Sequence, residues 1–229
     1  AKWSVAEETE LQGEPFGYGT YRLTILLPET APRRLGIYLD SIGTAYELYV
    51  DGEKKAQVGT VGTGRGSSHP RWRKHVVEVD RRDSIMELVF QVSNFHDTAG
   101  GIHYPLNLGT VKQAYAKRYG KLLLDLFLFG SLLIMALYHF GLFMYRRKDL
   151  SPLYFGFLTL LFAVRVIFHN GTYVLLLFPE FPWALQMKIA YLTFSIPPML
   201  FYRFITSLYP DYTPRWSVRL SDLLSLLYS

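Results

Sequence analysis

A run of 24 mostly apolar residues, 122–145, constrains this chain more than any other feature of its sequence. As a helix the run is roughly 36 Å long, which exceeds the hydrocarbon core of a bilayer, about 30 Å. Asp125 is the only residue of fixed charge within it. The run therefore predicts a membrane-spanning helix, with one part of the chain before it and another after it.

Further apolar segments follow this run. They cover about 153–169 with an extension toward 178, then 187–208, and finally a stretch that starts near 217 and continues to the last residue. The pair Pro197-Pro198 is expected to kink the third span. Since the sequence stops partway into a fourth span, we predict that 122–229 is a truncated α-helical transmembrane bundle.

Charge is distributed unevenly along the chain. Residues 1–110 carry 12 Lys and Arg against 14 Asp and Glu, a net of −2, whereas 111–229 carry 12 against 5, a net of +7. The basic excess borders apolar runs, which is typical of membrane flanks rather than of a nucleic-acid surface. Arg146, Arg147 and Lys148 between the first two spans favour a cytoplasmic loop and an N-terminal part outside, although basic residues also precede the first span.

Three polar side chains inside the predicted spans are candidates for a function in the membrane: Asp125, His139 and Arg165. Asp125 and His139 fall on one stripe of the first helix, and Arg165 lies at a similar depth to Asp125 on the second. We predict an ion pair between Asp125 and Arg165 that faces the bundle interior, because an isolated charge is costly in lipid. The alternative is that each side chain snorkels to the outer interface.

Residues 1–113 predict an all-β domain. Polar and apolar residues alternate in 20–26 and 45–50, and the second of these runs ends at Asp51-Gly52, a hairpin turn signal. Short strands at this spacing, without an amphipathic helix between them, favour a sandwich or jelly roll. Further strands are predicted at 35–39, 73–79, 85–93 and 103–108.

The segment SNFHDTAGGIHYP, 93–105, concentrates polar residues between the β-rich and apolar parts. His96, Asp97 and His103 carry metal-ligand atoms, but they come from one loop with a seven-residue gap and no helix to fix them. The chain has no cysteine, which excludes disulfides and cysteine-ligated zinc. We therefore expect no metal and no cofactor here, and without a serine nucleophile or a spaced carboxylate pair we expect no enzyme active site.

Two interpretations of 93–105 stay open. Asn94 at a strand end and the Gly100-Gly101 pair favour a sharply turned loop that side-chain to backbone hydrogen bonds hold in place. The functional alternative is a loop at one end of the sandwich that binds a small polar ligand. The candidate ligand-binding residues are Asn94, His96, Asp97, His103 and Trp72.

The glycine-rich stretch GTVGTGRGSSHP, 59–70, raises the question of a phosphate-binding loop. It lacks the Gly-Lys-Ser/Thr ending, and the residues after Pro70 continue as a strand rather than as a helix. We predict a mobile loop between strands. Trp72, just beyond it, either stacks on a sugar ring or packs within the domain.

Several stretches resemble the bacterial seven-transmembrane receptors with diverse intracellular signalling modules. The most specific is YHFGLFMYRRKDLSPLYFG, 138–156, and GYGTYRLTILLP, AYELYVDGEKKAQVG and ELVFQVSNFHDTAGGIHYPLNLGT agree with it. The N-terminal part also resembles the galactose-binding-like jelly roll of family 2 glycoside hydrolases. The residues that carry this second resemblance are Tyr21, the turn at 50–52 and the loop at 94–101.

The resemblance implies a multi-pass sensory receptor fragment of the bacterial inner membrane, with its β-sandwich outside the cytoplasm. It implies as partners the lipid bilayer, a small polar ligand with carbohydrate as one class, and a cytoplasmic output domain that is absent here. That output domain would be a kinase or a nucleotide cyclase. Nucleic acid is not expected as a partner, and a homodimer is left open.

We expect that ligand at the 93–105 loop shifts the seating of the sandwich on the first span through a short joint, 114–121. One alternative is a membrane-tethered carbohydrate-binding or envelope assembly module that does not signal. Another is a transporter or membrane enzyme with an accessory β-domain, in which Asp125, His139 and Arg165 carry the transport or proton chemistry.

Overall fold

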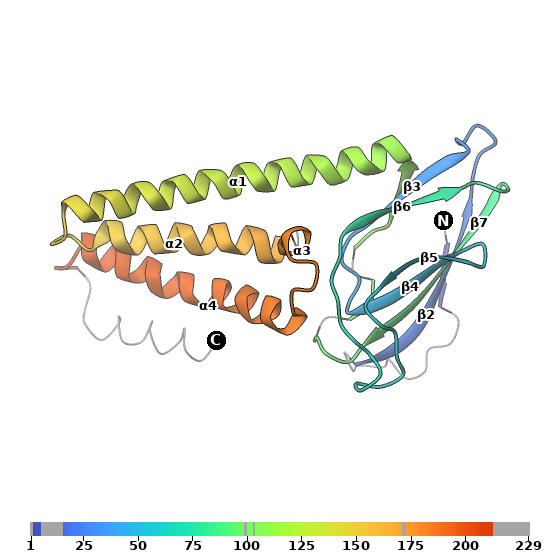
Figure 1. Ribbon diagram of the computed structural model, residues 1–229, viewed down its shortest axis with the longest axis horizontal. Helices are drawn as coiled ribbons and strands as arrows, with labels where there is room; N and C mark the ends of the chain where they lie inside the picture. Colours follow the sequence, from blue (N-terminus) through green and yellow to red (C-terminus); the bar gives the residue numbers. More distant parts are fainter. Residues whose placement is uncertain (1, 6–15, 99, 103, 171–172, 213–229) are drawn as a thin grey trace. The chain divides into compact units, whose positions relative to one another are not determined.

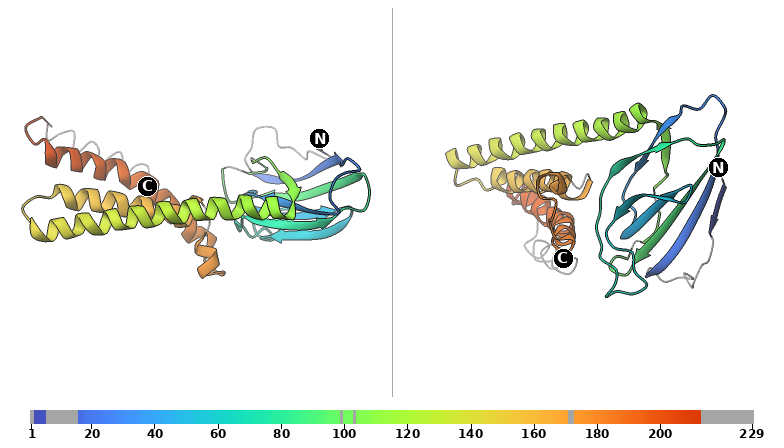
Figure 2. Two further views of the ribbon diagram at one scale, coloured as in Figure 1. Left: turned by 90° about the horizontal axis from the view of Figure 1, so that it is seen from above. Right: turned by 45° about the vertical axis from the view of Figure 1, so that its right-hand side comes forward.

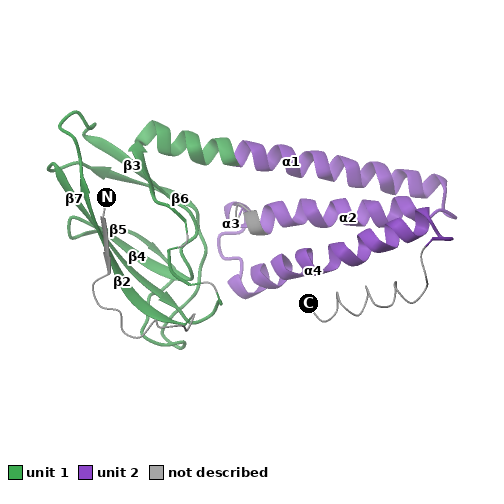
Figure 3. Cartoon of the chain, turned by 180° about the vertical axis from the view of Figure 1, so that it is seen from behind, with its two compact units in different colours: residues 1–121 green, residues 122–229 purple. Residues whose placement is uncertain are grey.

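The computed structural model describes residues 2–5, 16–98, 100–102, 104–170 and 173–212 (Figure 1). The chain divides into two compact units between Lys121 and Leu122 (Figure 3). The first unit is a β-sandwich that continues into the beginning of a long helix. The second is helical.

Two antiparallel sheets form the sandwich (Figure 2). The strands are β1 (Lys2–Val5), β2 (Gly17–Leu26), β3 (Arg34–Leu39), β4 (Ala45–Val50), β5 (Glu53–Val58), β6 (His75–Asp80), β7 (Ile85–Asn94) and β8 (Asn107–Thr110). The larger sheet has the order β1-β2-β7-β4-β5, and the smaller has the order β6-β3-β8. The prediction of an all-β sandwich followed by apolar helices is confirmed.

The hydrophobic core lies between the two sheets, because alternate residues of each strand point inward. Leu48 and Phe90 of the larger sheet belong to the same buried cluster as Ile37 and Val77 of the smaller one. β2 and β7 pair along their whole lengths. The end of β7 that carries Asn94 is therefore held by the longest ladder of the sandwich.

The strands lie close to their predicted positions, with one shift. The hairpin of β4 and β5 turns at Asp51 and Gly52, whose φ angles of 49° and 79° are those of a type I′ turn. The strand predicted at 103–108 begins only at Asn107. Pro105 precedes it and has no N–H to give to a ladder.

The helix α1, Val111–Tyr145, begins directly after β8. Thr110 and Gln113 cap it reciprocally: the backbone N of Gln113 donates to Thr110 Oγ1 at 3.1 Å, and the backbone N of Thr110 donates to Gln113 Oε1 at 2.9 Å. Ala114 is buried, and a Cβ added to Gly36 of β3 would lie 2.7 Å from its methyl group. The residues predicted as a joint are therefore helical and follow a turn that is seated on the sheet.

The remaining helices belong to the second unit. They are α2 (Ser151–Arg165), the π-helical turn η1 (Val166–Asn170), α3 (Val174–Leu177) and α4 (Trp183–Leu208). Asp149 accepts hydrogen bonds from the backbone N and the hydroxyl of Ser151, at 2.9 and 2.7 Å, and both bonds lower the pKa of that carboxyl group. They fix the start of α2.

Within the described residues, two helices are long and apolar enough to span a membrane: α1, and the continuous stretch Ser151–Phe168. In α1 only 6% of the most apolar window is buried in the protein, which leaves its apolar side chains for lipid. Two of the predicted spans thus meet the requirement for crossing the membrane by length and composition.

The third predicted span corresponds to α4, which has 26 residues and is long enough to cross a bilayer. It contains two charged residues, Lys188 and Arg203. This span stays a prediction. Pro197 and Pro198 lie inside α4 rather than at its end, and the fourth predicted span lies outside the described residues.

Candidate functional site

Asn94, the last residue of β7, organises the loop that follows it. Its side chain is only 4% exposed. Its Nδ2 donates to the backbone O of Asp97 at 2.6 Å, and its Oδ1 accepts from the backbone N atoms of Asp97 and His96 at 3.2 and 3.5 Å. The amide group therefore closes the turn from inside.

His96 joins this loop to the glycine-rich connection between β5 and β6. Its Nε2 lies 3.0 Å from the backbone O of Ser68 and donates to it, because a carbonyl oxygen only accepts. Ser68 is buried, and its hydroxyl lies 3.0 Å from the hydroxyl of Ser93, which also accepts from the backbone N of Gly62 at 3.3 Å. A buried polar network thus holds the two loops together.

The glycine pair of the loop has two different physical roles. Gly101 has a φ of 93°, as predicted, and it exchanges backbone hydrogen bonds with Gly43 at 2.9 and 3.2 Å. Gly100 is needed for space instead, since a Cβ there would lie 2.3 Å from Nδ2 of Asn94. His103 lies outside the described residues. The described residues contain no group of three or more His, Asp or Glu side chains suited to a metal ion.

The glycine-rich connection, 59–70, is closed by hydrogen bonds and leads into strand β6. Thr60 and His69 exchange backbone hydrogen bonds, each 3.0 Å long. Gly59 has a φ of 70°, and a Cβ on it would lie 2.4 Å from the backbone O of His69. Only glycine allows this close approach. The geometry of a phosphate loop that opens a helix is absent from this connection.

A shallow groove of about 390 Å³ lies beside β5 and this connection. The polar side chains that line it are Gln57, Thr60, His69, Arg71 and Arg73, and the lining includes no carboxylate. The groove was not predicted from the sequence. The signal that could have indicated it is the basic cluster of His69, Arg71 and Arg73, all three of which line the groove.

Trp72, predicted either to stack on a sugar or to pack, is half-buried between two groove residues. Its indole N–H is buried and has no hydrogen-bond partner among the described residues, and the same holds for the hydroxyl of Tyr46 and Nδ1 of His75. The rings of Tyr46 and His75 are stacked, with centroids 6.4 Å apart. Burial, together with the charges of Arg73 and Arg118, lowers the pKa of His75 to about 4.

An ion triad connects the segment after the groove to the base of α1. Nζ of Lys74 lies 2.9 Å from one carboxylate oxygen of Asp40, and Nζ of Lys121 lies 3.2 Å from the other. Burial alone would raise the pKa of Asp40. The hydrogen bond and charge of Lys74, the backbone N–H of Ser41 and the charge of Lys121 outweigh it and lower that pKa.

The polar residues predicted within the membrane have other partners than expected. In the described part of the chain, Asp125 and Arg165 do not form the predicted ion pair. Asp125 is 6% exposed and accepts a hydrogen bond of 2.6 Å from the hydroxyl of Tyr173, whereas Nη1 of Arg165 donates to the backbone O of Ala190 at 3.0 Å. Among the described residues, a phenol group and a carbonyl group, rather than an opposite charge, therefore form the hydrogen bonds of these two side chains.

Arg165 and His139 also contact aromatic rings. The guanidinium of Arg165 lies 5.4 Å from the ring centroid of Phe194. His139 donates from Nδ1 to the backbone O of Met135 at 2.8 Å, and its ring lies 4.5 Å from that of Phe155 on α2. His139 therefore packs between helices and bonds to its own.

The sandwich and the apolar helices define a membrane protein with an accessory β-domain. Residues 121–229 match the family model described as 7TM diverse intracellular signalling. The helical part of this chain thus resembles a family of membrane signalling proteins, in agreement with the resemblance found in the sequence.

Solved structures similar to the chain include two enzymes. One is a putative β-galactosidase from Bacteroides fragilis, with 17% identity and a TM-score of 0.33 over 41% of this chain and 15% of that one. The other is a family 2 β-galacturonidase from Eisenbergiella tayi bound to galacturonate, with 15% identity and a TM-score of 0.32 over 42% and 17%. The chain thus spans less than a fifth of either enzyme. Comparison with curated proteins gives no match.

Proposed function

We propose that the chain is the sensing and membrane part of a receptor, in which the β-sandwich binds a small ligand outside the cytoplasm and α1 carries the resulting change into the membrane. The ligand is polar, with carbohydrate among the candidate classes. An output domain in the cytoplasm would receive the signal, and the chain itself would act as a sensor rather than as an enzyme. The match of its helical part to the family model for 7TM diverse intracellular signalling supports this proposal.

One structural observation carries the proposal: β8 runs into α1 without a linker, and α1 continues as a single helix from Val111 to Tyr145. A rigid helix transmits a tilt or rotation applied at one end to the other, whereas a flexible linker would absorb it. The burial of Ala114 against Gly36 seats the first turn on the sheet. A shift of the small sheet therefore moves the helix that enters the bilayer.

The ion triad adds a second point of attachment. Asp40 follows β3, whose neighbours β6 and β8 make up the rest of the small sheet, and Lys121 lies three helical turns into α1. Asp40 is also three residues from Gly43, which pairs with Gly101 of the 93–101 loop. A change in these loops can therefore reach Lys121 through Asp40 as well as through β8.

The experiment is a ligand screen on the full chain in nanodiscs. Thermal-shift measurements with neutral sugars, sugar acids, small organic acids and divalent cations identify compounds that raise the unfolding midpoint by mass action. Hydrogen exchange of the amides in 111–121 is then measured with and without each binding compound. We expect a binder to change exchange in this stretch. No binder in any class, or a binder that leaves 111–121 unchanged, would contradict the proposal.

A further inference from the structure

We propose that the groove beside β5 is a binding site for a small anion whose recognised group is a carboxylate or a phosphate. The site is lined by His69, Arg71 and Arg73 together with Gln57 and Thr60. The binding itself is independent of signalling. Its role as the sensing event rests on the function proposed above.

The first support is the way in which the fold builds the groove. The backbone hydrogen bonds between Thr60 and His69 hold the connection closed, and the backbone N of Arg71 donates to the backbone O of Thr44 at 2.9 Å. Arg71 and Arg73 both line the groove from this segment, whose backbone these hydrogen bonds hold in place.

The second support is charge. The lining holds two guanidinium groups and a histidine but no carboxylate, and no ion pair found among the described residues includes Arg73. By contrast, Arg34 pairs with Glu78 at 2.8 Å, and Lys54 pairs with Glu47 at 2.7 Å. Arg73 therefore brings to the groove a positive charge that no ion pair among the described residues neutralises.

A second basic groove, of about 710 Å³, shows the contrast. It contains Arg33, Arg81 and Arg82, but Asp80 also lines it. Arg81 donates to the backbone O atoms of Pro28 and Glu29 at 2.9 and 3.0 Å, and Arg82 pairs with Glu53 at 2.7 Å. Because a carboxylate lines this groove and two of its three cations hold loops, we assign no ligand to it.

The residue types define the ligand. A guanidinium group presents parallel N–H donors that match the two oxygens of a carboxylate or a phosphate, and charge-assisted bonds of this kind are stronger than neutral ones. The amide of Gln57 and the hydroxyl of Thr60 supply neutral donors and acceptors suited to ligand hydroxyl groups. A volume of about 390 Å³ lies within the range of small-molecule sites. Sugar acids and small phosphorylated compounds fit this description.

The position of the groove gives binding a route to α1. Arg73 is followed directly by Lys74, and the carboxylate of Asp40 lies between Lys74 and Lys121 of α1. An anion bound to Arg71 and Arg73 would displace the segment that ends in Lys74. The ion triad would then transmit the displacement to α1.

The test uses the full chain in nanodiscs of zwitterionic lipid, with isothermal titration calorimetry as the binding measurement. The probes are glucuronate, glucose and inorganic phosphate. Glucuronate and glucose differ only in a carboxylate in place of a CH₂OH group, so the pair isolates the contribution of charge. We expect glucuronate, phosphate or both to bind and glucose not to bind, and the stronger of the two anions identifies the recognised group.

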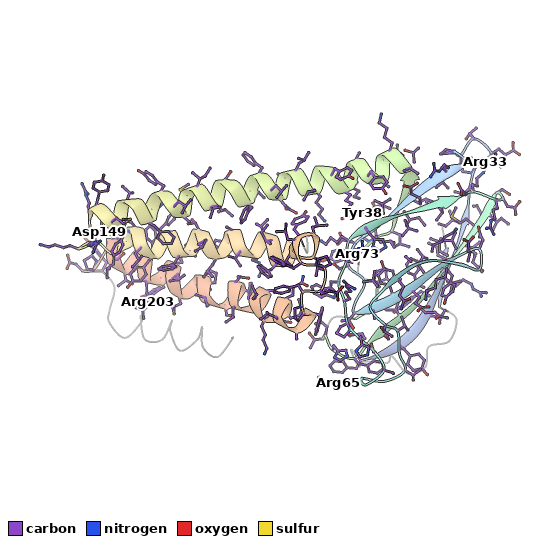
Figure 4. All side chains as sticks on the ribbon, viewed as in Figure 1. Arg33, Tyr38, Arg65, Arg73, Asp149 and Arg203 are labelled. Carbon is purple, nitrogen blue, oxygen red and sulfur yellow. The ribbon has the colours of Figure 1, made fainter. Side chains whose placement is uncertain are left out.

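Matched variants locate the site. Arg73→Gln and Arg71→Gln each remove one guanidinium from the groove, and we expect each to weaken anion binding about tenfold or more, the loss of one charge-assisted hydrogen bond. Arg65→Gln removes the same charge from the same connection between β5 and β6, outside the groove lining (Figure 4). We expect this control to change affinity by less than about twofold. An unchanged unfolding midpoint without anion shows that each variant is folded.

Several results would overturn the site: neither anion binds, glucose binds as tightly as glucuronate, or the groove variants bind like Arg65→Gln. The titration does not depend on any movement of α1. If an anion binds, Arg73→Gln abolishes that binding, and hydrogen exchange of 111–121 does not change, the site is confirmed and its role in signalling is rejected. A different compound that binds elsewhere and changes that exchange would support the receptor function and reject the groove as its sensing site.

Discussion

The 93–101 loop and the groove beside β5 use their polar residues in opposite ways. In the loop, the side chains of Asn94 and His96 bond to the protein's own backbone. In the groove, the backbone is already closed by its own hydrogen bonds, and Arg73 has no ion-pair partner among the described residues. The polar cluster of the loop thus holds the loop in place, and this difference is the basis for proposing the ligand site in the neighbouring segment.

The largest effect is expected from Asn94→Ala. This change removes one donor and two acceptor contacts from a buried side chain, so we expect the free energy of unfolding to fall by about 3 kcal/mol. Asn94→Asp keeps the acceptor oxygen for the two backbone N–H groups and should recover part of the loss. Thermal unfolding of the full chain measures both. Equal stability of Asn94→Ala and wild type would break the contrast between loop and groove.

A pH dependence is expected from His75 at the end of the groove segment. Because its pKa is lowered to about 4 in the folded state, the unfolded chain takes up a proton near pH 6.5 while the folded chain does not. Stability should therefore decline as the pH falls from about 6.5 to about 4, by about 2 kcal/mol after allowance for partial exposure.

The control for this effect is His75→Phe, which keeps a ring to stack on Tyr46. In this variant, the unfolding midpoint should depend less steeply on pH across the same range, because the contribution of His75 is removed. If the variant keeps the full slope of the wild type, the histidine does not titrate as the burial of its ring requires.

A smaller effect is expected from His96→Ala. The change removes the hydrogen bond to the backbone O of Ser68, so we expect a loss of about 1 kcal/mol in stability and no more than a small change in anion affinity. His96→Gln keeps a side-chain donor and serves as the control. Calorimetric titration with glucuronate or phosphate checks the second part: a tenfold loss of affinity in His96→Ala would make the loop part of the site.

The smallest effect on stability is expected from Lys121→Gln, because the Lys121 side chain is about half exposed and such ion pairs contribute at most about 1 kcal/mol. The pKa of Asp40 is lowered, so the contribution of its ion pairs is present above the ordinary aspartate range and is lost as the pH falls through the folded-state value. Hydrogen exchange in 111–121 should instead respond clearly, since α1 loses its charged contact with Asp40. Unchanged exchange would mean that the triad does not hold α1.

Local patterns in the sequence were enough to predict much of the fold. The alternation along β2 and β4, the turn at Asp51-Gly52 and the apolar run of α1 are properties of neighbouring residues. The groove was not predictable in this way, because its walls come from β5 and from a segment about a dozen residues later. The spacing of Thr110 and Gln113 is that of a helix cap and could have predicted the start of α1. The sequence analysis instead predicts a joint at 114–121 before the helix.

The helices show the same limit. The cost of a charge in lipid predicts that Asp125 and Arg165 have polar partners. It does not predict which residues those partners are. They depend on rotation about each helix axis, and the π-helical turn η1 changes that rotation just after Arg165. Tyr173, beyond that turn, reaches Asp125. The spacing of residues along straight helices therefore does not predict the hydrogen bond between Tyr173 and Asp125.

The most direct test of the receptor account is a distance measurement across the base of α1. The chain has no cysteine, so spin labels at Asp83→Cys on the sandwich and Ala116→Cys on α1 report one distance by electron paramagnetic resonance. With a saturating anion from the titrations, we predict a shifted distance distribution in the otherwise wild-type chain and a much smaller shift when Asp40→Asn is added. An identical distribution with and without the bound anion would contradict the account.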